Sequence, residues 1–158
     1  MLKRFFLYVL ALCAVGVVLL VGVAYEPDRP LESLQARWAP PPSRFMVVDG
    51  LRVHLRDEGP RDDALPIVLI HGTSASLHTW EGWARTLRGQ RRVIRFDLPG
   101  IGLSDAWPLQ AADYSGESYA RFALQVLHAL GVSQAVVGGN SLGGEVAWRA
   151  WPWPRHKP

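Results

Sequence analysis

Ser141 lies in a glycine-rich segment of the kind that places a reactive hydroxyl at a turn from a strand into a helix. The segment is Gly138-Gly139-Asn140-Ser141-Leu142-Gly143-Gly144, and it follows the apolar run Ala135-Val136-Val137. Glycines two positions before and two positions after the serine leave room for a sharp turn, in which a Cβ would strike the neighbouring strand or helix. The spacing predicts a nucleophile at Ser141 and a helix that begins near Leu142. The alternative is a glycine-rich turn with an incidental serine.

A second turn, upstream of the first, has the pattern of an oxyanion-hole loop. The apolar run at residues 66–70 is typical of a strand buried on both faces, and it ends in His71-Gly72-Thr73-Ser74. In such a loop an amide just past the glycine points at the oxygen that becomes negative during acyl transfer. We therefore expect Thr73 and Leu142 to donate the two amides. His71 directly follows the strand, so a turn-forming role fits it better than that of a catalytic base.

A third motif completes a resemblance to the N-terminal part of the α/β-hydrolase family. It is Asp97-Leu98-Pro99-Gly100-Ile101-Gly102-Leu103-Ser104, and it follows the strand-like residues 92–96. The family carries His-Gly after its third strand and Asp-x-Pro-Gly-x-Gly-x-Ser after its fourth. The resemblance covers about residues 44–149 and implies that Asp97 and Ser104 are structural. Related dehalogenases and epoxide hydrolases have Asp at the nucleophile position, so Ser141 argues against both activities.

The start of the predicted sheet is an antiparallel hairpin. Residues 45–48 and 51–55 flank Asp49-Gly50, the strongest short-range hairpin signal. His54 alternates with the apolar residues Val53 and Leu55, so we expect its side chain on the outward face of the strand.

Two helices are predicted between the later strands. Apolar residues at helical spacing indicate one helix over residues 78–87, with Trp80 and Trp83 on its core face. A second is expected over residues 117–130, with Ser115 as its cap. The alternation of strand and helix predicts a parallel sheet with right-handed crossovers.

The resemblance implies an incomplete α/β-hydrolase fold. Five strands can be counted through Ser141, whereas the family's sheet normally has three more and takes its acid and histidine from the loops after them. Downstream of Ser141 the sequence offers only Glu145 and His156, and neither matches those positions. No triad acid or base is therefore assigned. Because a serine hydroxyl needs a base to become a good nucleophile, we expect the chain to be inactive in this form.

The last nine residues do not resemble the end of a domain. Residues 150–158 contain three prolines, which a buried helix does not tolerate. Plausible codons for this stretch, shifted from within the Arg149 codon, encode an apolar continuation of the helix. Our hypothesis is a frameshift, in the gene or in its sequencing, that removed the C-terminal half. The alternative is a natural short variant.

The N-terminus predicts a membrane anchor. Residues 5–24 carry no charge and have the length that a helix needs to cross a bilayer. Lys3 and Arg4 precede them, so the positive-inside rule places the N-terminus in the cytoplasm and the hydrolase part outside it. A cleaved signal peptide and a secreted protein are the alternative. The expected organisation is an anchor (1–25), a Pro-rich linker with a short helix near 31–38 (26–43), a partial hydrolase domain (44–149) and the aberrant tail (150–158).

Charge and composition exclude several partners. The formal net charge is +3, but four of the 17 basic residues lie at the two ends, which leaves 13 against 14 acidic residues. Nucleic acid is therefore not an expected partner. Neither metal-ligand spacing nor a phosphate loop occurs, so we expect no metal and no cofactor. The expected partners are the lipid bilayer, through residues 5–24, and a small substrate with an ester or similar acyl bond if the chain is active.

Two functions follow from these features. The first is a membrane-anchored serine hydrolase in truncated form, with Ser141 as nucleophile. The second is a non-catalytic anchored fragment or interaction module.

Overall fold

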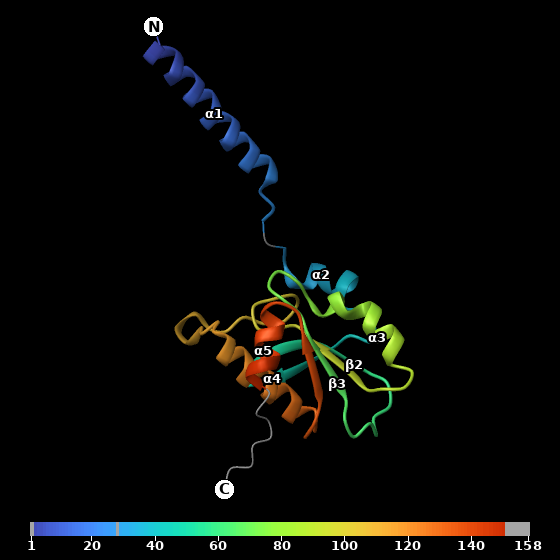
Figure 1. The fold of residues 1–158 in the computed structure, drawn as a ribbon. Helices are drawn as coiled ribbons and strands as arrows, with labels where there is room; N and C mark the ends of the chain where they lie inside the picture. Colours follow the sequence, from blue (N-terminus) through green and yellow to red (C-terminus); the bar gives the residue numbers. More distant parts are fainter. Residues whose placement is uncertain (1, 28, 151–158) are drawn as a thin grey trace. The chain divides into compact units, whose positions relative to one another are not determined.

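The computed structural model describes residues 2–27 and 29–150, which divide into two units, Met1–Pro30 and Leu31–Pro158. The first unit is built on the helix α1 (Leu2–Ala24; Figure 1). None of the described residues of this unit is buried. α1 is long and apolar enough to span a membrane, a property that signal sequences near an N-terminus share. The predicted tail from residue 151 onward lies outside the described residues.

The second unit contains a mixed five-stranded sheet. Its strands are β1 (Arg44–Val48), β2 (Leu51–Glu58), β3 (Ile67–Ile70), β4 (Val93–Phe96) and β5 (Val136–Gly139). They lie in the order β1-β2-β4-β3-β5, with β2 antiparallel to both β1 and β4, and β3 parallel to both β4 and β5. The predicted hairpin is confirmed, since Asp49 and Gly50 have φ values of 50° and 78°.

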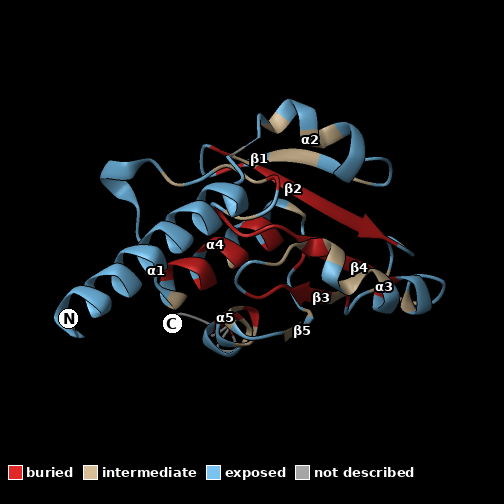
Figure 2. Cartoon of the chain, turned by 90° about the horizontal axis from the view of Figure 1, so that it is seen from above, coloured by how far each residue is buried: buried red, intermediate tan, exposed pale blue. Residues whose placement is uncertain are grey.

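Alternation along the strands divides the core between two faces of the sheet. Val68 and Ile70 of β3 pack in the larger cluster with α4 (Gly116–Ala129) and α5 (Leu142–Ala150). Ile67 and Leu69 belong to a smaller cluster with α3 (Glu81–Leu87) on the opposite face. Figure 2 shows β2, β3 and β4 mostly in the red of buried residues.

The second predicted helix is confirmed with its cap. α4 begins after Ser115, whose Oγ accepts the backbone N–H of Ser118 at 3.2 Å. Its buried apolar residues recur at helical spacing, and Gly131, with a φ of 68°, follows its end.

The first predicted helix is shorter than expected and partly of another type. Residues 77–80 form a 3₁₀ helix, η1 (Leu77–Trp80), and only residues 81–87 are α-helical. The expectation that Trp83 is a core residue is wrong, because its side chain is 62% exposed. Its ring contacts the edge of Trp80 at a centroid distance of 6.1 Å, while Ala84 takes the position facing the sheet.

The outward face of β2 is also buried, contrary to the simple expectation from alternation. His54 does point away from the main apolar cluster, but its side chain is fully buried. The 3₁₀ helix η1 and the short helix α2 (Leu31–Trp38) contribute the aromatic and polar side chains around it. The helix expected near residues 31–38 is therefore present, and it belongs to the same unit as the sheet.

Candidate active site

The predicted nucleophile occupies the turn between β5 and α5. Ser141 is exposed and has a φ of 52°, a left-handed conformation that residues with a Cβ adopt at a cost of about 1–2 kcal/mol. The backbone N–H groups of Gly143 and Gly144 donate to the carbonyls of Asn140 and Ser141, both at 2.9 Å. A strained, exposed serine between a strand and a helix has the geometry of a nucleophile elbow.

Two glycines allow α5 to start against the end of β3. A Cβ on Gly143 would overlap the carbonyl oxygen of Ile70 and would lie 2.6 Å from that of His71. A Cβ on Gly139 would in turn overlap the carbonyl of Gly143. Close backbone packing therefore requires glycine at both positions that flank Ser141 in the sequence motif.

The loop after β3 lies directly against this elbow. A Cβ added to Gly72 would stand 3.1 Å from the Cβ of Ser141 and 3.0 Å from the carbonyl oxygen of Asn140. Within the described part of the chain, the backbone N–H groups of Thr73 and Leu142 have no hydrogen-bond acceptor. The structure thus brings the two predicted loops together and leaves free the two amides that the sequence predicts for an oxyanion hole.

His71 holds this loop to its neighbour and is fully buried. Its Nε2 accepts the backbone N–H of Leu98 at 3.0 Å, so the ring proton lies on Nδ1, which donates to the carbonyl of Gly72 at 2.8 Å. Both ring nitrogens are engaged with the backbone, which agrees with the turn-forming role expected of this residue.

Asp97 is a structural carboxylate at the centre of the loops. Its Oδ1 accepts the N–H of Leu77 at 2.7 Å, and its Oδ2 accepts the N–H of Leu103 at 2.9 Å and Nδ1–H of His54 at 2.8 Å. Burial alone would raise the pKa of Asp97, but these hydrogen bonds outweigh burial and hold the pKa below its ordinary value. Ser104 also has a structural role, since its Oγ donates to the Asp97 carbonyl at 2.8 Å.

None of the histidines among residues 2–27 and 29–150 forms a hydrogen bond with Ser141. His54 and His71 are buried in the contacts given above, and His78 contacts Ser76 and Arg56. His128 is exposed on α4.

The downstream candidates offer no partner for the serine either. Glu145 is exposed and accepts a hydrogen bond from Arg149 Nε at 2.8 Å, while His156 lies outside the described residues. The described residues also contain no group of three or more potential metal ligands.

A buried polar cluster on the outward face of β2 and β4 escaped the sequence analysis. Arg56 and Arg95 are direct cross-strand partners, and both donate to Oε2 of Glu81, at 2.9 and 3.0 Å. Glu58 pairs with Arg95 on the same face. The signal was available in the sequence, because β2 alternates polar residues with apolar ones and Arg95 interrupts an otherwise apolar strand.

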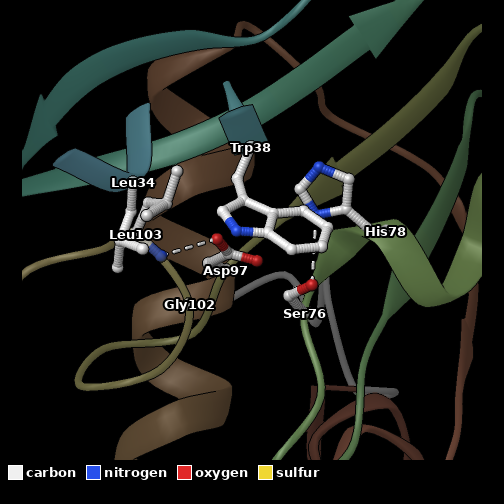
Figure 3. Close-up of a pocket in the computed structure, with 7 residues that line it drawn as sticks. All are labelled: Leu34, Trp38, Ser76, His78, Asp97, Gly102 and Leu103. Carbon is white, nitrogen blue, oxygen red and sulfur yellow. Dashed lines mark hydrogen bonds between the residues drawn. The ribbon is translucent and has the colours of Figure 1, made fainter. Parts of the chain in front are cut away.

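Arg56 of this cluster contacts His78, which lines a pocket of about 240 Å³ beneath α2. Its lining comes from α2, from the start of η1 and from the loop after β4, and Figure 3 shows the indole of Trp38 lying across Asp97 and beside His78. The Trp38 and His78 rings meet edge to face at 5.7 Å. Burial, followed by the positive charge of Arg56, lowers the pKa of His78.

Comparison with known proteins establishes the family. A family model described as alpha/beta hydrolase fold matches residues 66–151, more than half of the chain. The chain therefore belongs to the α/β-hydrolase family, and its sheet and helices are the corresponding part of that fold.

Relatives with several activities resemble the chain. It is 34% identical over 112 residues to 2-hydroxymuconate semialdehyde hydrolase from Pseudomonas sp. (strain CF600), covering 69% of this chain and 38% of the relative. It is 33% identical over 99 residues to epoxide hydrolase 4 from Mus musculus, covering 63% and 27%. The crystal structure of a membrane phospholipase A, described as a bacterial virulence factor, matches with a TM-score of 0.66 and 30% identity, covering 94% of this chain and 47% of that one. The chain thus spans about a third of the length of these two curated relatives.

Proposed function

We propose that the chain carries the nucleophile and the oxyanion hole of a serine hydrolase that cleaves an ester or related acyl bond. The observation that carries this proposal is the left-handed Ser141 in its turn, with the Gly72 loop packed against it. That combination positions a hydroxyl beside backbone amides, which is what acyl transfer requires.

In the proposed reaction, Ser141 Oγ attacks the carbonyl carbon and the substrate's carbonyl oxygen becomes negative. The N–H groups of Thr73 and Leu142 stabilise that oxygen. The proton of Ser141 must pass to a base, and the described residues place no imidazole there. An oxyanion hole and substrate binding alone give only a residual rate, so we propose that the chain as given is nearly inactive in turnover.

We further propose that residues 5–24 anchor the protein in a bilayer, with the N-terminus cytoplasmic and the hydrolase part on the other side. The match to the membrane phospholipase A supports an association with the membrane, because coverage of 94% of this chain must include part of residues 1–30. A secreted protein that loses these residues as a signal peptide is the alternative. The mass of the mature protein distinguishes the two.

A non-catalytic anchored fragment or interaction module is the second candidate function. The observation that favours it is that Ser141 lacks a histidine partner among the described residues.

Labelling with a fluorophosphonate probe tests the first function against the second. The full chain in detergent micelles should be labelled slowly, because no described base activates the hydroxyl, and Ser141→Ala should abolish labelling. Ser133→Ala, an exposed serine outside the site, is the matched control and should keep it. Absence of labelling in the unmodified chain, with the fold intact by circular dichroism, would favour the second function.

A further inference from the structure

The last residue of the predicted linker makes two contacts with the sheet. Ser43 Oγ lies 2.9 Å from Nε2 of His54 and accepts a hydrogen bond from Nε of Arg56 at 2.8 Å. Both partners belong to β2, and they lie on its outward face. The residue that ends the Pro-rich segment is therefore bonded to the polar cluster beneath α2.

From Ser43 the contacts continue to Asp97. An ionised carboxylate only accepts hydrogen bonds, so Nδ1 of His54 carries the proton that bonds Asp97 Oδ2 at 2.8 Å. The Ser43 hydroxyl accepts from Arg56 and has its own hydrogen available for Nε2 of His54. His54 and Asp97 are both fully buried, so water does not replace these bonds.

Asp97 and Leu98 bond the two ends of the loop that packs against Ser141. At one end, the N–H of Leu77 donates to Asp97 Oδ1. At the other end, the N–H of Leu98 donates to His71, which bonds Gly72. The position of Thr73, between those ends, thus depends on the position of Asp97.

The residue types Ser, His and Asp invite comparison with a catalytic triad, but the setting is wrong for catalysis. His54 and Asp97 have no exposed surface, and Ser43 Oγ is already engaged with a guanidinium group. We infer instead that Ser43 and His54 are positioning residues, which fasten the linker to Asp97 and through it fix the oxyanion-hole loop. This inference rests on the proposed function only where it treats that loop as part of an oxyanion hole.

The hydrogen bonds that join Ser43, His54 and Asp97 are called the relay below. Hydrogen exchange on the full chain in detergent micelles tests whether the relay fixes the oxyanion-hole loop. Ser43→Ala should speed exchange about tenfold in residues 71–77 and 97–104, because it removes the hydrogen bonds of Ser43 Oγ with His54 and with Arg56, and should leave α4 unchanged. Ser43→Thr keeps the hydroxyl and should restore the original rates. Ser133→Ala is the matched control and should alter neither segment. Unchanged exchange in Ser43→Ala, or an equal increase throughout the sheet and α4, would overturn the inference.

The rate of fluorophosphonate labelling gives a second readout. Labelling of Ser141 should slow in Ser43→Ala and recover in Ser43→Thr, whereas equal rates in all three proteins would refute the positioning role. If the unmodified chain is not labelled at all, the proposed function fails. The exchange result still decides whether the relay exists, so the two failures are distinguishable.

Discussion

The elbow around Ser141 and the relay around Asp97 use similar residue types in opposite ways. At the elbow, a serine is exposed and strained, two backbone amides lack acceptors, and no described imidazole is bonded to the hydroxyl. In the relay, Ser43, His54 and Asp97 are joined at 2.8–2.9 Å, and Asp97 accepts three hydrogen bonds.

The difference shows why residue identity is a poor guide to reactivity. Buried polar groups with every bond satisfied stabilise a unique arrangement, whereas reactive groups retain free donors and access to substrate. The elbow has an exposed hydroxyl and two amides without acceptors, as the second kind of group does, although no described imidazole is bonded to Ser141. The relay consists of buried polar groups that are bonded to one another, although its residue types match those of a catalytic triad.

The largest effect is expected at Asp97. Asp97→Ala should lower the free energy of unfolding by about 3 kcal/mol or more, because it leaves three buried donors without an acceptor. Urea unfolding of the full chain in detergent, followed by tryptophan fluorescence, measures this change. Asp62→Ala, at an exposed position, is the matched control and should change stability by less than about 0.5 kcal/mol. A small effect at Asp97 would remove the contrast between the two regions.

At the elbow, two adjacent glycines should respond in opposite directions. Gly143→Ala should destabilise by about 1–3 kcal/mol, because its Cβ would overlap the carbonyl of Ile70. Gly144→Ala places its Cβ at an ordinary 3.5 Å from the Gly139 carbonyl, so the better helix propensity of alanine should stabilise by up to about 1 kcal/mol. Equal effects in the same unfolding assay would mean that the elbow is not packed as described.

The elbow was predictable from sequence because its determinants are local. The packing of Gly143 against Ile70 joins distant parts of the chain, but glycines at fixed offsets around Ser141, after an apolar run, are enough to specify the turn itself. The same holds for the hairpin at Asp49-Gly50 and for the cap of α4 at Ser115. These features involve residues within a few positions of one another.

The relay was not predictable because its contacts join distant parts of the chain. Alternation along β2 placed His54 on the correct face, but burial of that face depends on α2 and η1, more than ten residues away in either direction. Likewise, the first turn after the β3 loop is a 3₁₀ helix whose leading N–H, on Leu77, bonds Asp97 twenty residues later. Trp83 is exposed for a related reason, since the shortened α3 presents only part of its surface to the sheet.

Relief of backbone strain at Ser141 should change stability less than the substitutions at Asp97 and Gly143 do. Ser141→Gly removes the Cβ from a left-handed residue and should stabilise by up to about 1 kcal/mol, while abolishing fluorophosphonate labelling. Ser133→Gly, where φ is not positive, should instead destabilise by about 0.5–1 kcal/mol. If Ser141→Gly also destabilised, the elbow would not store strain, and its difference from the relay would lie in exposure alone.

The smallest expected effect concerns the pH dependence of the cluster under α2. Burial and Arg56 lower the pKa of His78 below its ordinary 6.5, so the folded state binds fewer protons than the unfolded state as the pH falls through 6.5. Stability should therefore decline between pH 7.5 and 5.5, and the decline should be modest because the ring is only half-buried. His78→Gln should flatten this decline, whereas the neighbouring Thr79→Ala should keep the original slope because it removes no titrating group. An unchanged slope in His78→Gln would show that the pocket under α2 tolerates a charged imidazole.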